Sequence, residues 1–141
     1  MKANDRLWAI SLFLAMLALT GGCASTPLHT VNSFVTNREA LAYGKRTPMT
    51  TFTQEDTIRG FFVDLQWDDP TKEAGYHNVK WNWYSGDQLI STGGRGFQFK
   101  HTPYELWGEK PASALGLGHF KVDVLVDNHV MATQEFTIAA K

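Results

Sequence analysis

The sequence has little charge of either sign and a single cysteine. Of its 141 residues, 13 are Lys or Arg and 14 are Asp or Glu, so the formal net charge is −1. A chain this close to neutral offers no basic face for a phosphate backbone, which argues against nucleic-acid binding. Because Cys23 is the only cysteine, an internal disulfide is excluded. The 43% of apolar residues argue against a disordered chain, and the length fits one compact domain.

The sequence also lacks the motifs that carry common chemistries. None of the five histidines stands at metal-ligand spacing from another His or Glu, as HExxH would require. The GxSxG nucleophile motif is absent. The glycine-rich stretch Gly93-Gly94-Arg95-Gly96 joins strand to strand, whereas a phosphate loop leads into a helix. We therefore expect no catalytic residue, no metal site and no cofactor, and we interpret the protein as non-enzymatic.

An apolar run of membrane-spanning length is missing too. The stretch from Leu7 to Leu19 is apolar except for one serine and is 13 residues long, whereas a transmembrane helix needs about 20 apolar residues. Lys2 and Arg6 precede this run, and small residues follow it up to Cys23. A basic start, a short apolar core and small residues at its end are typical of a secretory signal peptide.

The residues Thr20-Gly21-Gly22-Cys23 resemble the lipobox of bacterial lipoproteins. The resemblance implies that residues 1–22 are a cleaved signal peptide and that Cys23 becomes the acylated N-terminus, held in a bilayer by palmitate-type chains. Ala24, where inner-membrane lipoproteins carry Asp, resembles the outer-membrane pattern. The implied location is the bacterial cell envelope, anchored at the outer membrane on the periplasmic or the surface side. The alternative is an ordinary cleaved signal that leaves Cys23 as a free thiol.

Residues 23–49 show no clean hydrophobic period. Turn and breaker residues occur at Ser25-Thr26-Pro27 and from Gly44 to Pro48. Between them, Ser33 is able to cap a short helix that would extend to Tyr43. We interpret the segment as the lipidated N-terminus and a tether that holds the following domain away from the membrane. The alternative is that it packs as an early strand of that domain.

Apolar and polar residues alternate with a period of two throughout residues 50–141. The alternation is clearest in Arg59–Trp67, Val79–Tyr84 and Phe120–Val126, and it is typical of half-buried antiparallel strands. Asp127-Asn128 separates two such stretches and predicts a two-residue hairpin turn. This spacing predicts about seven short strands, each bounded by turn residues.

These strands and turns resemble an immunoglobulin-like domain. The resemblance implies an all-β fold, an antiparallel two-sheet sandwich over residues 50–141. Trp81 or Trp83 on a central strand resembles the core tryptophan of that fold, although the inter-sheet disulfide is absent. We expect Gly93-Gly94 to end one strand. A small closed barrel is the alternative architecture.

Aromatic residues that the core does not need are the remaining sign of function. Phe62 and Tyr84 fall on the strand faces opposite the predicted core, and Tyr104 and Trp107 follow Pro103 in an irregular stretch. Such side chains provide a large contact area at little cost in entropy, so all four are candidates for binding a partner or a glycan. The structural alternatives are that Tyr104 and Trp107 cover an open sheet edge and that Phe62 and Tyr84 only pack.

The expected function is that of a membrane-anchored lipoprotein, a non-catalytic binding or accessory subunit of a cell-envelope assembly such as a secretion, pilus or outer-membrane machine. Its expected partners are the membrane, through the acyl chains on Cys23, and other envelope proteins. Confinement to one layer raises the effective concentration of such partners. The first alternative is a polysaccharide- or peptidoglycan-binding lipoprotein, and an enzyme is the third class.

Overall fold

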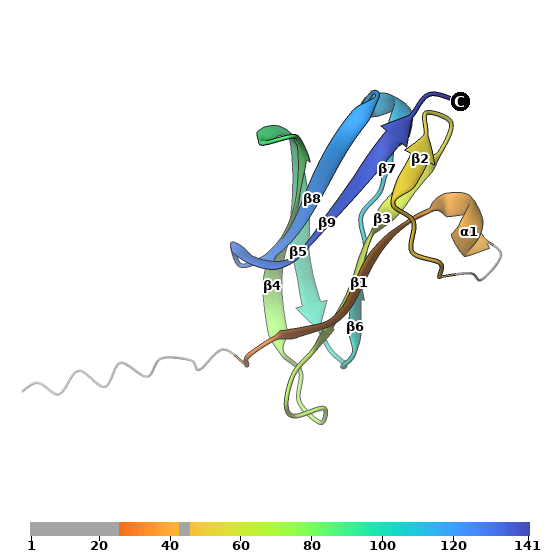
Figure 1. The fold of residues 1–141 in the computed structure, drawn as a ribbon. Coiled ribbons are helices and arrows are strands. Elements are labelled where there is room, and N and C mark those ends of the chain that lie inside the picture. Colours follow the sequence, from red (N-terminus) through yellow and green to blue (C-terminus); the bar gives the residue numbers. More distant parts are fainter. Residues whose placement is uncertain (1–25, 43–45) are drawn as a thin grey trace, which may run out of the picture.

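The domain consists of two β-sheets packed face to face, in a computed structural model that describes residues 26–42 and 46–141 (Figure 1). The first sheet contains β1 (His29–Asn37), β3 (Thr57–Gln66), β6 (Tyr104–Leu106) and β7 (Lys110–Pro111). The second contains, in spatial order, β2 (Thr51–Thr53), β9 (His129–Ala139), β8 (Gly118–Val126), β4 (Gly75–Ser85) and β5 (Gln88–Phe99). The short helix α1 (Arg38–Ala42) follows β1, and the 3-10 turn η1 (Ala112–Ala114) follows β7.

β3 is the central strand of the first sheet. It pairs with β1 along one side and with β6 and β7 along the other, antiparallel in every case. In the second sheet β4, β5, β8 and β9 are antiparallel neighbours, and β2 pairs parallel with β9. The predicted all-β, immunoglobulin-like two-sheet sandwich is therefore confirmed, and the closed barrel is not.

The alternating residues supply the core between the sheets. Val63 and Leu65 of β3 face the other sheet and are fully buried. Trp81 and Trp83 of β4 are both buried there, as the alternation along this strand predicts. Burying a side chain such as Val or Leu contributes roughly 1.5–3 kcal/mol. The alternation thus correctly predicts which side chains point inward, and the burial of these side chains stabilises the sandwich.

The Asp127-Asn128 hairpin is confirmed between β8 and β9. Both residues have positive φ, 49° and 68°, as a two-residue turn of the mirror-image type requires. The backbone N–H of Asp127 also donates to the carbonyl oxygen of Asn78 at 2.8 Å. The turn is therefore fixed to β4 as well as to its own strands.

The tether expected over residues 23–49 is wrong for residues 29–37, because these form β1 within the first sheet. Phe34, Val35 and Thr36 are consecutive buried residues, so both faces of β1 are covered and the strand shows no alternation in the sequence. The helix is also shorter than expected. Asn37, not Ser33, caps it, since its Oδ1 accepts a hydrogen bond from the N–H of Ala40 at 2.8 Å.

Gly93-Gly94 does not end a strand, because β5 continues through it and pairs with β4 on both sides of these glycines, interrupted only by a bulge at Ile90. The two glycines differ in their surroundings. A Cβ at Gly94 would lie 2.3 Å from the carbonyl oxygen of Val79, whereas a Cβ at Gly93 would meet no atom within 4 Å. A glycine inside a strand commonly marks a close approach of backbone, which explains Gly94 but not Gly93.

Two sequence predictions lie outside the described residues: the signal peptide 1–22 and the lipid attachment at Cys23. Both stay predictions. Within residues 26–42 and 46–141, no helix is long and apolar enough to cross a membrane.

Candidate binding groove

A groove of about 420 Å³ opens at one edge of the sandwich. On one side lies β5, the edge strand of the second sheet, and on the other lie residues 107–110, which connect β6 to β7 of the first sheet. Three tryptophans line it, Trp81, Trp83 and Trp107. Its volume falls within the range of about 300–1,000 Å³ that is usual for small-molecule sites.

The floor of the groove is formed by Trp81 and Trp83, whose indoles also belong to the core. Trp81 is 7% exposed, and its Nε1–H is buried without a hydrogen-bond partner. Gly108 lies against this part of the indole, so close that a Cβ there would stand 2.9 Å from Nε1. By contrast, Nε1 of Trp67 donates to the carbonyl oxygen of Lys72 at 2.7 Å. A buried N–H without an acceptor costs about 1–3 kcal/mol.

Charged side chains around the groove already have partners within the protein. Nζ of Lys110 donates to Oγ of Ser91 at 2.9 Å, across the groove. The guanidinium of Arg38 binds the Glu109 carboxylate at 3.2 Å, and that of Arg95 lies 4.6 Å from the centroid of the Phe97 ring. The rim is therefore polar but balanced in charge.

Of the four aromatic candidates, only Trp107 lines this groove, where it is 41% exposed. Tyr104 is half-buried and stacks on Phe99, with ring centroids 4.5 Å apart. Tyr84 is half-buried on the outer side of β4, and Nζ of Lys121 lies 4.5 Å from its ring centroid. The structure does not bring the four side chains together.

Phe62 is wrong as a contact residue, because it is only 5% exposed. It lies on the outer side of its sheet as predicted, but its cross-strand neighbour Phe34 stacks on it with centroids 5.1 Å apart. The guanidinium of Arg46 covers it further, at 5.8 Å from the ring centroid. Its burial thus depends on β1, which the sequence did not reveal.

Sequence reasoning missed Trp81 and Gly93 as parts of a site. The two residues are directly opposite each other in the pairing of β4 and β5, and cross-strand partners project to the same side of a sheet. The available signal was Gly93 itself, a glycine within a stretch of strand residues.

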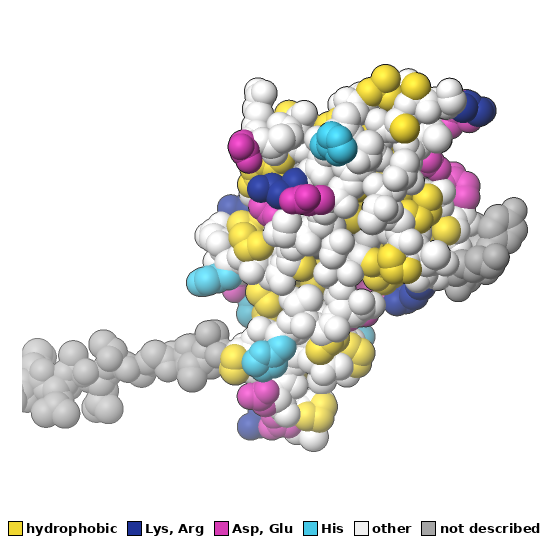
Figure 2. All heavy atoms as spheres, in the orientation of Figure 1, with side chains coloured by type: hydrophobic (Ala, Val, Ile, Leu, Met, Phe, Trp, Pro, Cys, Tyr) yellow, Lys and Arg dark blue, Asp and Glu magenta, His cyan; other side chains and the backbone are white. Residues whose placement is uncertain are grey.

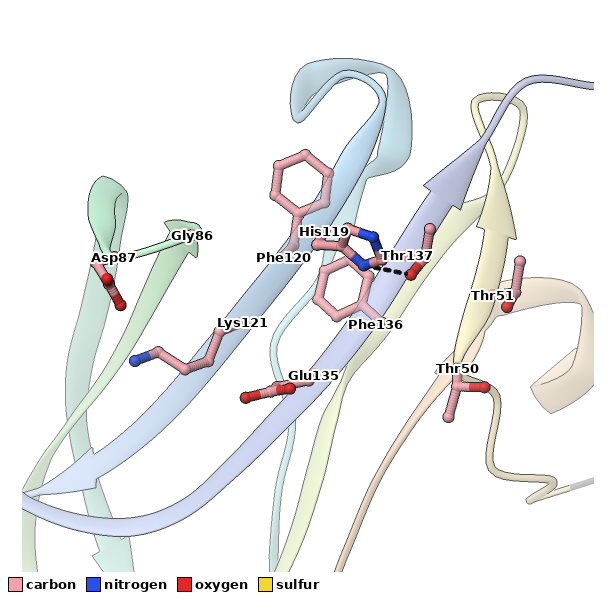
Figure 3. A pocket seen from close by; sticks show the side chains of 10 residues that line it. All are labelled: Thr50, Thr51, Gly86, Asp87, His119, Phe120, Lys121, Glu135, Phe136 and Thr137. Atoms are coloured by element: carbon pink, nitrogen blue, oxygen red, sulfur yellow. Dashed lines mark hydrogen bonds between the residues drawn. The ribbon is translucent and has the colours of Figure 1, made fainter.

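A second groove, also about 420 Å³, lies at the end of the sandwich near the β4–β5 turn (Figure 3). The side chains of Lys121 and Glu135 lie on neighbouring strands, with Asp87 beyond Lys121. Nδ1 of His119 and Oγ1 of Thr137 are 3.0 Å apart. Among residues 26–42 and 46–141, no three His, Cys, Asp or Glu side chains are grouped so that they could hold a metal ion.

The buried histidine, His77, contacts the turn between β8 and β9 and the residue just before β4. His77 lies 2.7 Å from Oδ2 of Asp127 through Nδ1 and 3.2 Å from the carbonyl oxygen of Ala74 through Nε2. Partial burial acts to raise the pKa of Asp127, but hydrogen bonds from the Asn78 backbone and from His77 outweigh it, and the pKa lies below its usual value. These contacts fix the β8–β9 turn against β4.

The face over β8 and β9 differs from the groove. Figure 2 shows acidic and basic side chains next to each other there, with hydrophobic side chains scattered between them. Large contiguous apolar patches mark interaction sites, and this face presents none in that view. The groove between β5 and residues 107–110 differs from this face because three tryptophans line it.

The fold is similar to that of an immunoglobulin-like protein from Pseudomonas aeruginosa, with 9% sequence identity and a TM-score of 0.49. The similarity covers 82% of this chain and 99% of that chain. No protein-family model and no curated protein matches the sequence. The fold itself is an all-β, immunoglobulin-like sandwich.

Proposed function

We propose that this protein is a lipid-anchored, non-catalytic binding subunit of a bacterial cell-envelope assembly that captures an extended segment of another envelope protein. The supporting observation is the edge strand β5. Among the described residues it pairs on one side only, with β4, and it exposes Leu89 and Ile90 by 49% and 40%. An extended segment would add to this edge as a further strand.

The composition of β5 agrees with this function. Edge strands are normally protected by charged residues, by proline, by β-bulges or by their shortness, and β5 has one bulge, at Ile90 near its turn. β5 spans 12 residues, contains no proline and carries Arg95 as its one charged residue. Backbone N–H and C=O groups along such an edge provide affinity, and apolar side chains at the edge provide specificity.

The proposed anchor is the acylated Cys23, which would fix the domain at the outer membrane. β1 begins at His29, only a few residues beyond that position, so the domain would stay close to the bilayer. Confinement raises the effective concentration of partners in the same layer, so a modest contact along β5 would suffice.

Photo-crosslinking in intact cells tests the proposal. A photoreactive side chain replaces Ile90 in the full chain, and the matched control carries it at Thr133, an exposed residue of the interior strand β9. We expect one predominant protein adduct from position 90 and none from position 133. Equal labelling at both positions, or none at either, contradicts strand capture.

Mass spectrometry tests the anchor separately. We expect the mature protein to begin at Cys23 and to carry acyl chains. An unmodified thiol on a mature N-terminus at Cys23 contradicts the lipoprotein assignment, and a chain without an anchor would lose the confinement described above.

A second candidate function is binding of polysaccharide or peptidoglycan. The observation that favours it is the tryptophan-lined groove between β5 and residues 107–110, since indole rings are suitable platforms for the C–H faces of sugars.

A further inference from the structure

The groove at the open edge contains a hydrogen-bond donor that the protein does not use. Nε1–H of Trp81 is buried without an acceptor, covered by Gly108. A buried polar group of this kind is unusual in folded proteins. It would be satisfied by an oxygen atom of a ligand that takes the place of the contact with Gly108.

Gly93 keeps the groove open. It lies opposite Trp81 across the β4–β5 pairing, and a Cβ there would meet no atom within 4 Å. Its φ is not in the left-handed region either, so neither backbone conformation nor packing requires glycine. A strand residue with a side chain would be more favourable by roughly 0.5–1 kcal/mol. What the glycine provides is space above the indole of Trp81.

The boundaries of the groove select for a compact ligand. The Lys110–Ser91 hydrogen bond, 2.9 Å long, crosses the groove between its two walls. An extended peptide lying inside the groove would need a channel without this crossing, whereas a compact ligand would not.

The charges around the groove select for a neutral ligand. Lys110 and Arg95 have partners within the protein, and Glu109 binds Arg38. A charged ligand would compete with these contacts. The unsatisfied donor at the floor requires only a neutral oxygen acceptor.

We propose that the groove binds one acetamido-sugar ring of an envelope glycan. The ring packs against the exposed part of Trp107 and over Gly93, and its acetamido carbonyl oxygen accepts the hydrogen bond from Nε1–H of Trp81. This inference rests on the second candidate function above and names the ligand class for that site.

The test uses the full chain purified in detergent micelles and a defined probe, the β-1,4-linked tetramer of N-acetylglucosamine. The matched control ligand is the β-1,4-linked tetramer of glucose, which lacks the acetamido group. Titration calorimetry is expected to show at least about tenfold tighter binding of the acetamido sugar, the effect of one good hydrogen bond. Equal affinity for both sugars, or no binding of either, overturns the inference.

Indole N–H resonances locate the ligand in the same titration. The resonances of Trp81 and Trp107 are expected to shift with the acetamido sugar. The Trp67 resonance is the internal control, since its N–H is already bonded to the Lys72 carbonyl oxygen. Shifts confined to indoles other than Trp81 and Trp107 contradict the site.

A variant that fills the groove shows whether sugar affinity is lost while the stability of the fold is kept. Gly93→Val adds a side chain in open space, so we expect an unchanged or higher melting temperature together with at least a tenfold loss of affinity for the sugar. Gln98→Val is the matched control, because it adds the same side chain to an exposed position of β5 away from the groove. Undiminished sugar binding by the folded Gly93→Val protein refutes the inference.

Removing the donor alone tests the hydrogen bond. Trp81→Phe keeps an aromatic floor but lacks the N–H, so it should bind the two sugar tetramers equally. A variant that still prefers the acetamido sugar contradicts the assigned contact.

Failure of this inference and failure of the proposed function are distinguishable. If neither sugar binds while position 90 still gives its protein adduct, the groove is not a glycan site but strand capture stands. If neither sugar binds and Gly93→Val abolishes the protein adduct from position 90, the groove belongs to the protein interface.

Discussion

The edge strands β1 and β5 differ in how the rest of the domain covers them. On the β1 side, Oγ1 of Thr30 donates to the Met131 carbonyl oxygen at 2.7 Å, and Nε2 of Gln134 donates to Oγ of Ser33 at 2.9 Å. These bonds join the first sheet to β9 of the second. On the β5 side, a groove separates the sheets, with the buried Trp81 and Trp83 at its floor and the exposed Trp107 at its wall. One side is thus closed by the domain's own chain, and on the other side β5 and the groove remain open among the described residues.

Aromatic residues show the same contrast. Phe34 and Phe62 stack on each other on the closed side and are buried. Trp107 on the open side remains 41% exposed. An aromatic residue outside the central core is therefore buried within the fold on the first side and left partly exposed to solvent on the second.

The largest expected effect concerns the closed side. Phe34→Ala removes a buried ring and its stacking partner for Phe62, so we expect a loss of about 3–5 kcal/mol in the free energy of unfolding. Trp107→Ala on the open side should lose much less, because Trp107 is partly exposed. Chemical denaturation of both variants measures the difference, and a similar loss at both positions would remove the contrast between the sides.

Within β5, the two adjacent glycines should respond in opposite directions. Gly94→Ala places a Cβ against the Val79 carbonyl oxygen, at 2.3 Å before any adjustment, and should destabilise the domain by about 1–3 kcal/mol. Gly93→Ala should be neutral or stabilising by up to about 1 kcal/mol. Thermal unfolding of the two variants tests this. A destabilised Gly93→Ala protein would show that the groove wall is tighter than described.

The contact between His77 and Asp127, at the end of the sandwich, should respond to pH. The pKa of Asp127 is lowered on folding from its ordinary value of 3.8, so its stabilisation is present above that pH and is lost as the pH falls below it. Asp127→Asn should cost about 1 kcal/mol at pH 7, less at pH 3. Denaturation at both pH values measures this, and a loss that does not shrink at low pH contradicts the ionised hydrogen bond.

The smallest effect is expected at the exposed edge. Ile90→Ser should change the free energy of unfolding by no more than about 0.5 kcal/mol, because Ile90 packs against little of the domain. Its effect should appear in partner capture instead. Reduced recovery of the envelope partner with unchanged thermal unfolding would sharpen the difference between β1 and β5, whereas a large loss of stability would show that the β5 edge is part of the core.

Local patterns in the sequence were sufficient for much of this fold. Alternation identified β4, β8 and β9, and Asp127-Asn128 identified the turn between the last two, because both signals depend on neighbouring residues alone. Phe62 was assigned to the correct face of its strand for the same reason. Its burial was not predictable, since it requires Phe34, a residue distant in sequence.

The sequence by itself determined the fold class, the inward-facing residues of the long strands and the absence of an internal disulfide. Only the tertiary structure decided that residues 29–37 form an edge strand, that β5 runs through Gly93-Gly94, and that Trp81 meets Trp107 in one groove. The physical reason is the range of the interactions. Alternation and turn preferences act between neighbours in the chain, whereas strand pairing and the closing of one edge depend on which distant segments meet.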